Sequence, residues 1–483
     1  MRIAMAASEV APFAKTGGLG DVTASLARYL AAAGHDVRLF LPFYGNLRER
    51  NRSFSAVTFV RDVPIRFGAR EYDFSLVTTT LPGTELPVYF VVCPELYARA
   101  ATYTADADEH LRFAMLSRAA IESCQRMGFA PDVFHVHDWH TALVPLYLKT
   151  LYAWDRLFAS TRTVLTIHNI AYQGTVSADA RHELGFTDVA NLLHQDDLAR
   201  GRLSFLTTGL LWADALTTVS RTHAKEMMTP EHGFGLDPIL RARADSFVGI
   251  VNGIDTAVWS PEIDPHIAVR YSAEDLDGKA ECRRALCREM GLDFAPRAPI
   301  LGVVSRLTAQ KGFELAFNVL PRALEFTPLR LAVLGSGDAG LEAFFHGLER
   351  RFPGRAAFRQ GYNDALAHRI EAGSDFFLMP SLFEPCGLNQ MYSQRYGTVP
   401  VVRRTGGLAD TVRMFDPSTG RGTGFVFDHY TSQGLEWALV QALHTWNDPI
   451  SFAQVQLNGM AEDFSWESRV REYVSLYART RRG

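Results

Sequence analysis

Short apolar runs alternate with helical patterns along this chain, and that alternation limits the possible folds more than any other feature. The runs in the first half are Met1–Ala7, Asp36–Pro42, Val88–Cys93, Val133–Asp138, Thr163–Asn169 and Ala215–Ser220. The runs in the second half are Pro299–Ser305, Leu329–Gly335, Ala356–Gly361, Asp375–Pro380 and Thr398–Arg403. Continuously apolar runs are typical of parallel strands that are buried on both faces. The pattern therefore predicts an α/β fold with two doubly wound parallel sheets.

A polar, turn-rich segment with two prolines, residues 252–266, separates the two sets and is the best linker candidate. The length of 483 residues suits two domains. We expect Rossmann-like domains over residues 1–248 and 249–460, followed by a helical segment over residues 461–483. Ligands of such sheets bind at the carboxyl ends of the strands. Two such domains are expected to face each other across a cleft.

Composition excludes several classes of partner. The net charge of −4 provides no broad basic face for nucleic acid. The chain has no apolar run of transmembrane length, so no membrane partner is expected. Five cysteines, an odd number without a framework spacing, indicate a reducing compartment. The cytoplasm is the expected location.

The stretch FAKTGGLGDV, residues 13–22, lies between an apolar run and a helical pattern. Gly17 and Gly18 allow a close approach to backbone N–H groups, Lys15 adds a positive charge, and Asp21 follows them. The spacing matches neither a P-loop nor the dinucleotide fingerprint. The stretch is therefore interpreted either as an anion site of the kind that binds phosphate, or as a plain strand-to-helix turn.

Two further strand ends in the first half carry polar residues. HVHDWH, residues 135–140, is dense in potential metal ligands, but Asp138 lies one place too early for a di-metal motif. TIHN, residues 166–169, places His168 at the end of the next apolar run. Structural polar groups are one reading of both stretches. The other is a pocket for sugar hydroxyls, to which Asp and His donate and accept hydrogen bonds.

The second half offers charges and glycine-rich turns at corresponding places. Arg306 and Lys311 follow the first apolar run of this half, as expected for a diphosphate site rather than for two solvated cations. PSLFEPCGLNQM, residues 380–391, contains Glu384 and backbone N–H groups suited to an oxygen-rich ligand. Cys386 lacks an evident histidine partner, so we do not expect it to be a nucleophile. RRTGGLADTV, residues 403–412, forms another glycine-rich turn.

Taken together, these motifs resemble the bacterial glycogen synthase family, which is closely related to plant starch synthases. The ordered set is K-T-G-G-L-G-D-V, H-D-W-H, T-I-H-N, N-G-I-D, S-R-L-T-x-Q-K-G, E-P-C-G-L and R-T-G-G-L-A-D-T-V, from Lys15 to Val412. The resemblance implies a retaining GT-B glycosyltransferase that adds glucose from ADP-glucose to glycogen or another α-1,4-glucan. It also implies that the C-terminal helix packs back on the first domain.

The resemblance assigns roles to individual residues. It implies catalytic roles for Arg306, Lys311, Glu384, His168 and Asp138. It implies substrate binding by Lys15, Gly17, Gly18, Asp21, Asn169, Asn252, Tyr362, Cys386, Gly387, Leu388, Thr405, Gly406 and Gly407. Tyr362 would lie near the adenine, and the residues from Thr405 onward would close over the phosphates. Many relatives in the wider superfamily carry a second glutamate where this chain has Met391, so the ribose must be held in another way.

No metal and no cofactor are expected, because ADP-glucose is a substrate and fixed cations stabilise the departing diphosphate. No clear carboxylate nucleophile is evident, which favours front-face displacement. Two alternatives remain: a glucan synthase that uses UDP-glucose, and a catalytically silent sugar-nucleotide sensor. A phosphorylase would need a pyridoxal-phosphate lysine, and a Rossmann dehydrogenase would need the missing dinucleotide fingerprint.

Overall fold

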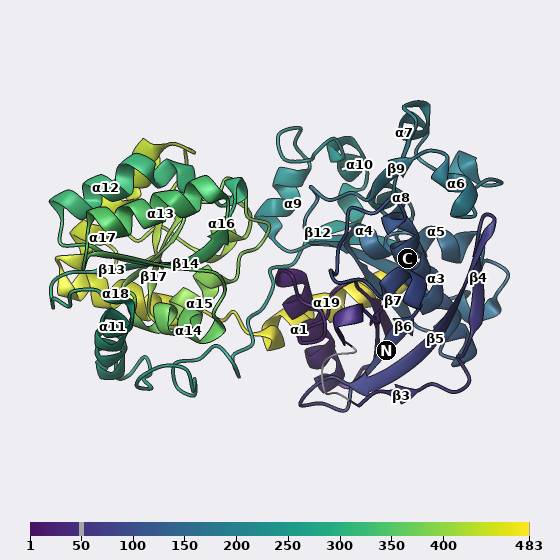
Figure 1. Ribbon diagram of the computed structural model, residues 1–483, viewed down its shortest axis with the longest axis horizontal. Coiled ribbons are helices and arrows are strands. Elements are labelled where there is room, and N and C mark those ends of the chain that lie inside the picture. Colours follow the sequence, from purple (N-terminus) through teal and green to yellow (C-terminus); the bar gives the residue numbers. More distant parts are fainter. Residues whose placement is uncertain (48–52, 483) are drawn as a thin grey trace. The chain divides into compact units, whose positions relative to one another are not determined.

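The computed structural model describes residues 1–47 and 53–482, which form two compact units (Figure 1). The first unit comprises Met1–Val219, Ala224–Ile250 and Trp466–Gly483. The second comprises Ser220–His223 and Val251–Ser465. The main division therefore falls between Ile250 and Val251, near the boundary expected at residue 248.

A ten-stranded sheet forms the centre of the first unit, in the order β12-β11-β8-β7-β1-β2-β6-β5-β3, with β4 paired to β5. The pairs from β12 to β6 are parallel, whereas β3, β4 and β5 pair antiparallel. The strands are β1 (Arg2–Ala6), β2 (Asp36–Pro42), β3 (Ser55–Ala56), β4 (Val63–Phe67), β5 (Arg70–Thr80), β6 (Pro87–Val92), β7 (Val133–His137), β8 (Arg162–Ile167), β11 (Ala215–Thr218) and β12 (Phe247–Gly249). A separate antiparallel pair consists of β9 (Thr175–Ser177) and β10 (Arg202–Ser204).

Helices of the first unit share one apolar core with this sheet. They are α1 (Gly18–Ala32), α2 (Pro94–Tyr97), α3 (Glu109–Arg126), α4 (Asp138–Thr141), α5 (Val144–Lys149), α6 (Ala180–Glu183), α7 (Gln195–Ala199), α8 (Phe205–Trp212), α10 (Asp237–Ala242), α19 (Trp466–Arg482) and, from Ala224 onward, α9 (Arg221–Met227). The C-terminal helix α19 packs against α1 and buries Trp466, Tyr473 and Tyr477 in this core (Figure 1). Aromatic burial of this size fixes the helix to the first unit.

The second unit contains a six-stranded, fully parallel sheet in the order β15-β14-β13-β16-β17-β18. Its strands are β13 (Ile300–Leu307), β14 (Arg330–Gly337), β15 (Ala356–Gln360), β16 (Phe376–Met379), β17 (Val399–Arg403) and β18 (Phe425–Phe427). Successive side chains of β14 enter different cores: Leu331 and Val333 enter one, and Ala332 and Leu334 enter the other. The apolar run in the sequence thus reflects burial on both faces of the sheet.

Helices cover both faces of this second sheet (Figure 1). They are α11 (Asp277–Met290), α12 (Ala316–Phe326), α13 (Ala339–Arg351), α14 (Asp364–Gly373), α15 (Asn389–Arg395), α16 (Gly406–Thr411), α17 (Ser432–Trp446) and α18 (Pro449–Met460). Residues of α12, α13 and α17 enter one core, whereas residues of α11 and α14 enter the other. Every apolar run identified in the sequence contains a strand, so the predicted two parallel-sheet α/β units are confirmed.

Two features of the fold differ from the sequence-based expectations. The antiparallel strands β3, β4 and β5 and the β9–β10 pair had no counterpart among the predicted strands. The segment 252–266 is not a free linker, because it packs into the second unit: the Trp259 ring stacks on His368, and the Asp264 side chain is fully buried. None of the helices in the described part of the chain combines the length and apolar character needed to cross a bilayer.

Candidate active site

Parallel topology brings several chain segments of the second unit to one edge of its sheet. The segments after β13, β15, β16 and β17 all leave the carboxyl ends of parallel strands in this one sheet. They contain most of the site residues predicted in this half of the sequence. Ligands of open α/β sheets bind at this edge. The topology therefore makes this edge the candidate site of the second unit.

An ion pair joins two of these segments. Lys311, in the 3-10 turn Ala309–Lys311 after β13, places its Nζ 2.5 Å from Oε2 of Glu384, in the segment after β16. Ser381 donates a hydrogen bond to the same carboxylate oxygen over 3.1 Å. The side chains of Lys311 and Glu384 are only 17% and 7% exposed, so little water screens their interaction. The structure brings these two predicted residues together.

Gly312 explains how the two segments approach so closely. Its φ is +69°, and a Cβ atom at this position would lie 2.1 Å from the carbonyl oxygen of Pro380. Both the backbone conformation and the close contact require glycine. The K-G dipeptide thus places the Lys311 cation beside the Glu384 carboxylate.

Arg306 and Tyr362 contribute a cation and an aromatic ring to the same edge of the sheet. Arg306 is the penultimate residue of β13, is exposed, and forms no ion pair within the described part of the chain. Tyr362 follows β15, is 73% exposed, and donates a hydrogen bond to Asp364 over 2.7 Å. An exposed guanidinium is available to an anion, and an exposed ring is available for stacking. Both side chains are thus open to a ligand.

The two glycines after β17 pack against the E-P-C-G-L turn. A Cβ atom on Gly406 would lie 1.9 Å from the carbonyl oxygen of Glu384, and one on Gly407 would lie 2.0 Å from that of Cys386. The N–H of Gly407 donates to the carbonyl of Glu384 over 3.1 Å. Thr405 precedes them as the N-cap of α16. The T-G-G turn therefore positions the glutamate turn.

The buried side chain of Gln390 supports the E-P-C-G-L turn. This residue was not identified from the sequence. Its side chain is fully buried, and its Nε2 donates to the carbonyl oxygens of Cys386 and Gly387 and to Thr411. Gly387 has a φ of +72°, so the chain reverses sharply just before α15. Leu388 is the N-cap residue of α15. The turn is thus held in shape by a buried amide.

We expect Gly407→Ala to lower kcat/KM for glucosyl transfer by about 10-fold or more, because the new Cβ displaces the Cys386 carbonyl and with it the Glu384 turn. The matched control is Gly347→Ala in α13, where a Cβ would meet nothing within 4 Å. That control should keep its activity and gain about 0.5–1 kcal/mol of stability. Equal activity of both variants would show that the close packing is unimportant.

Asn252 belongs to the second unit and is 4% exposed. Its Oδ1 atom is buried and has no hydrogen-bond partner within the described part of the chain. Buried side-chain oxygens without a partner are rare in folded proteins. This atom therefore fits the substrate-binding role that was expected for Asn252.

In the first unit, the glycine-rich stretch at the start of α1 is organised by a carboxylate that sequence reasoning missed. Glu9 is 3% exposed and accepts hydrogen bonds from the N–H and Oγ1 of Thr16, both over 2.6 Å, and from the N–H of Gly17 over 3.2 Å. Tyr103 donates to the same carboxylate over 2.6 Å. Gly17 is one of the two glycines expected to let this loop approach phosphate, and in the structure its N–H donates to Glu9.

The opposite side of this stretch is open. Cβ atoms on Gly17 and Gly18 would meet nothing within 4 Å. Lys15 is 44% exposed, and its Nζ lies 2.9 Å from Oδ2 of Asp21 in the first turn of α1. Glu9 thus fixes the turn from inside, while the glycines and Lys15 present an unobstructed surface. An anion can therefore approach the loop from the side of Lys15.

Asp138 connects the ends of β7 and β8. Its Oδ1 accepts hydrogen bonds from the N–H groups of His168, over 2.7 Å, and Asn169, over 3.3 Å. Its φ of +54° is unusual for a residue other than glycine, and such conformations cluster at functional sites. His168 Nε2 lies 3.0 Å from Nδ1 of His137. The structure thus brings together Asp138, His168 and Asn169.

Burial determines the charge states of Asp138 and His168. It raises the pKa of Asp138 to about 7, even though two backbone hydrogen bonds favour the ionised form. It lowers the pKa of His168 to about 3, so this imidazole is neutral at physiological pH. A neutral imidazole both donates and accepts hydrogen bonds. These properties suit contacts with sugar hydroxyls better than proton transfer from an imidazolium.

We expect Asp138→Asn to stabilise the fold at pH 8 more than at pH 5. The wild-type carboxyl has an ordinary pKa of 3.8 and a folded pKa of about 7. Its protonation therefore favours the folded state fully below pH 3.8, and this contribution is lost as the pH rises to about 7. Asparagine carries no charge and tolerates a left-handed backbone.

Thermal unfolding of wild type and Asp138→Asn at both pH values measures this effect. Asp179→Asn, at a carboxylate whose side chain is 88% exposed, is the matched control and should show no such dependence. A stabilisation by Asp138→Asn that does not change with pH would contradict the raised pKa.

The remaining histidines of HVHDWH are occupied in hydrogen bonds and ring contacts. His135 Nε2 lies 2.6 Å from Thr166 Oγ1, and His135 Nδ1 lies 2.8 Å from the Tyr477 hydroxyl of α19. The ring of His140 stacks on Tyr103. Burial lowers the pKa of both His135 and His140 to about 3. His135 thus links β7 to β8 and to α19, whereas His140 packs among aromatic side chains.

The chain is similar to known proteins over its whole length. Residues 2–242 match the family described as the starch synthase catalytic domain, and residues 292–454 match the family described as glycosyl transferases group 1. The chain is 44% identical over 486 residues to a glycogen synthase of Koribacter versatilis (strain Ellin345), which covers 100% of this chain and 98% of that protein. It is 45% identical over 488 residues to a glycogen synthase of Anaeromyxobacter sp. (strain Fw109-5), with 99% of each covered.

A solved structure extends this similarity to the fold. The catalytic domain of starch synthase IV from Arabidopsis thaliana, bound to ADP and acarbose, has a TM-score of 0.90 with this chain. The two sequences are 36% identical, and the match covers 100% of this chain and 99% of that one.

Proposed function

The chain belongs to the family of glycogen and starch synthases, and from this premise we propose that it transfers glucose from ADP-glucose to the non-reducing end of an α-1,4-glucan with retention of configuration. It is a glycosyltransferase of the GT-B fold, as the sequence motifs predicted. One observation carries the proposal beyond family membership: the Lys311–Glu384 ion pair lies at the carboxyl edge of a parallel Rossmann-like sheet, where Arg306 is exposed.

Arg306 and Lys311 stabilise the leaving group in this proposal. Cleavage of the anomeric C–O bond builds negative charge on the departing diphosphate and positive charge on the sugar. A fixed cation is effective here because it requires little reorganisation during the reaction. Arg306 supplies five N–H donors in a planar fork that matches phosphate oxygens. Lys311 supplies a second positive charge, held in place by Glu384 over 2.5 Å.

The nucleotide and the glucose are held by the neighbouring segments. Tyr362 stacks on the adenine with its exposed ring, and Glu384 with the backbone of Cys386, Gly387 and Leu388 binds glucose hydroxyls. Within the first unit, Asp138, His168 and Asn169 bind sugar hydroxyls, and Lys15 with its glycines binds phosphate. The support for these roles is the burial, hydrogen bonding and open faces of the residues described above.

We assign retention to front-face displacement. Glu384 is the carboxylate that we place beside the sugar in the second unit, and its charge is already engaged by Lys311 and by the Ser381 hydroxyl. A carboxylate held in this way is a weak nucleophile. It can still accept hydrogen bonds from sugar hydroxyls and stabilise positive charge on the sugar. The acceptor hydroxyl then attacks from the face that the diphosphate leaves.

A transfer assay tests the proposed function. Purified protein is incubated with glycogen and either ADP-glucose or UDP-glucose. The incorporation of glucose into glycogen and the release of the nucleoside diphosphate are both measured. We expect a higher kcat/KM with ADP-glucose, and NMR of the product should show new α-linkages. A higher kcat/KM with UDP-glucose would identify a UDP-glucose-dependent glucan synthase. Binding of ADP without any transfer would identify a silent sugar-nucleotide sensor.

We also propose that the protein works in the cytoplasm. The support is that all five cysteines are free thiols in the structure, as in a reducing compartment.

A further inference from the structure

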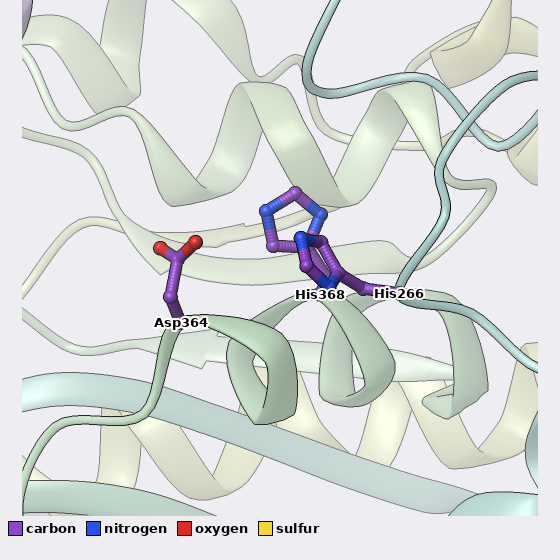
Figure 2. Close-up of side chains that lie close together, drawn as sticks. All are labelled: His266, Asp364 and His368. Atoms are coloured by element: carbon purple, nitrogen blue, oxygen red, sulfur yellow. The ribbon is translucent and has the colours of Figure 1, made fainter.

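Three potential metal ligands meet in the second unit, outside the residues assigned to glucosyl transfer. His266, Asp364 and His368 each offer one ligand atom, and these atoms all lie within 4.8 Å of one another. Asp364 and His368 are four residues apart on α14, a spacing that puts both on one face of the helix. His266 reaches the same place from the segment before α11 (Figure 2).

The buried member of the group is held in the orientation that a metal ligand requires. His368 is 1% exposed, and its Nδ1 lies 2.7 Å from Oδ2 of the fully buried Asp264. Donation from Nδ1–H to this carboxylate leaves a lone pair on Nε2. Metal-binding histidines commonly use their second nitrogen in this way, which fixes the tautomer and the ring orientation.

Other side chains make this arrangement rigid. The Trp259 ring stacks on His368 with a centroid distance of 3.7 Å and an interplanar angle of 10°. Tyr396 donates to Asp264 Oδ2 over 2.5 Å, and the backbone N–H of His266 donates to Asp264 Oδ1 over 2.8 Å. One buried carboxylate therefore orients His368 directly and anchors the backbone of His266. Such supporting contacts are typical of preorganised metal sites.

The two exposed members can complete the site by small rotations. His266 and Asp364 are both exposed, and the His266 and His368 rings are 4.9 Å apart. Ligand atoms around a tetrahedral zinc ion are about 3.3 Å apart, given zinc–nitrogen distances of about 2.0–2.1 Å. The three ligand atoms here lie within 4.8 Å of one another, so they need to move somewhat closer together to bind the ion. Asp364 Oδ1 accepts a hydrogen bond from the Tyr362 hydroxyl. Asp364 Oδ2 has no hydrogen bond within the described part of the chain and is the oxygen that would bind the ion.

The donor set selects the class of ion. Two imidazoles and one carboxylate suit Zn²⁺ and related transition-metal ions, whereas Mg²⁺ and Ca²⁺ prefer oxygen ligands throughout. We propose that His266, Asp364 and His368 bind one Zn²⁺ ion, with the fourth position open to water. The ion joins the segment containing His266 to the first turns of α14. It is separate from the transfer chemistry, for which no metal is expected.

Titration of the full chain with zinc tests this proposal. Protein purified without a histidine tag is treated with chelator, dialysed, and titrated with ZnCl₂ by calorimetry, and bound metal is counted by elemental analysis. We expect one Zn²⁺ per chain, and a loss of affinity of about 100-fold or more in His266→Ala and in Asp364→Ala. Mg²⁺ at the same concentration should give no binding heat.

His444→Ala is the matched control, because His444 is an exposed histidine on α17 of the same unit. It should bind zinc like the wild type. Co²⁺ provides a second readout, since its visible absorption distinguishes tetrahedral coordination by protein ligands from the hexa-aqua ion. Less than one bound Zn²⁺ in the wild type, or equal affinity in wild type and His266→Ala, would overturn the proposal. Neither the zinc titration nor the Co²⁺ absorption measures glucosyl transfer, so a failure of this proposal is distinguishable from a failure of the proposed function.

Discussion

Arg306→Ala should lower kcat/KM for transfer from ADP-glucose by about 100-fold or more while leaving the fold intact. The magnitude is that of losing one preorganised group that stabilises charge in the transition state. Arg306 is exposed and forms no ion pair within the described residues, so its removal breaks no internal contact of that kind. The change in stability should stay within about 0.5 kcal/mol. Initial rates and thermal unfolding of the same preparation measure both quantities.

Arg322→Ala is the matched control. Arg322 lies on α12 of the same unit, its side chain is 65% exposed, and it pairs with Glu436. This variant should keep its kcat/KM, which separates the role of Arg306 from a general loss of surface charge. Arg306→Lys should recover part of the activity, because lysine retains the charge but not the planar fork. Near-normal kinetics of Arg306→Ala would remove Arg306 from the diphosphate site.

Most of the parallel strands were predictable because each of them is encoded by a continuously apolar run of a few consecutive residues. Runs such as Leu329–Gly335 are apolar at every position, and the structure shows that alternate residues of β14 enter two different cores. The antiparallel strands could not be identified in the same way. In β4 and in part of β5 buried and less buried positions alternate, and the two strands form a hairpin whose turn is residues 68–69. The prediction rested on continuously apolar runs, and a strand that buries only one face has no such run.

The sequence motifs indicated individual candidate residues of the site, but not the contacts that support them. The motifs contain Lys311 and Glu384, whereas nothing in the sequence indicates that these residues form an ion pair across 73 positions. Glu9 and Gln390 were missed for the same reason, since each acts by binding the backbone of a turn that is defined only in three dimensions. For Glu9, the available signal was its position seven residues before Thr16.

The segment 252–266 shows a different limit of sequence reasoning. Its prolines and polar residues are typical of a linker, and it was predicted as one. In the structure the Asp264 carboxylate is buried and bonded to His368 and Tyr396, which lie more than a hundred residues away. A polar residue can be buried when partners satisfy it. Composition does not reveal those partners, so the metal-ligand group that includes His266 was also missed.

Glu384→Gln should have the largest effect of the single substitutions, a loss of kcat/KM of about 1000-fold. Glutamine keeps the shape of the side chain but removes the charge that faces Lys311 over 2.5 Å. The lysine then loses the partner that positions it, and the site loses a carboxylate that stabilises positive charge on the sugar. Both losses act on the same transition state.

Ser381→Ala is the matched control for Glu384→Gln, because it removes only the 3.1 Å hydrogen bond to the carboxylate. It should cost less than about 10-fold in kcat/KM, in keeping with one neutral hydrogen-bond donor. Circular dichroism and thermal unfolding confirm that each variant is folded. A normal kcat/KM in folded Glu384→Gln would exclude Glu384 from the reaction.

The double variant Lys311→Ala/Glu384→Gln tests whether the two residues act as one unit. Side chains that are in direct contact give non-additive effects. Removal of Lys311 alone leaves the Glu384 carboxylate, whose side chain is 7% exposed, without its cation, which is costly in a poorly solvated place. The double variant removes both charges together, so its kcat/KM should be close to that of the more damaged single variant. If the two losses multiply instead, Lys311 and Glu384 contribute independently, and the ion pair is not the means by which the lysine is positioned for the diphosphate.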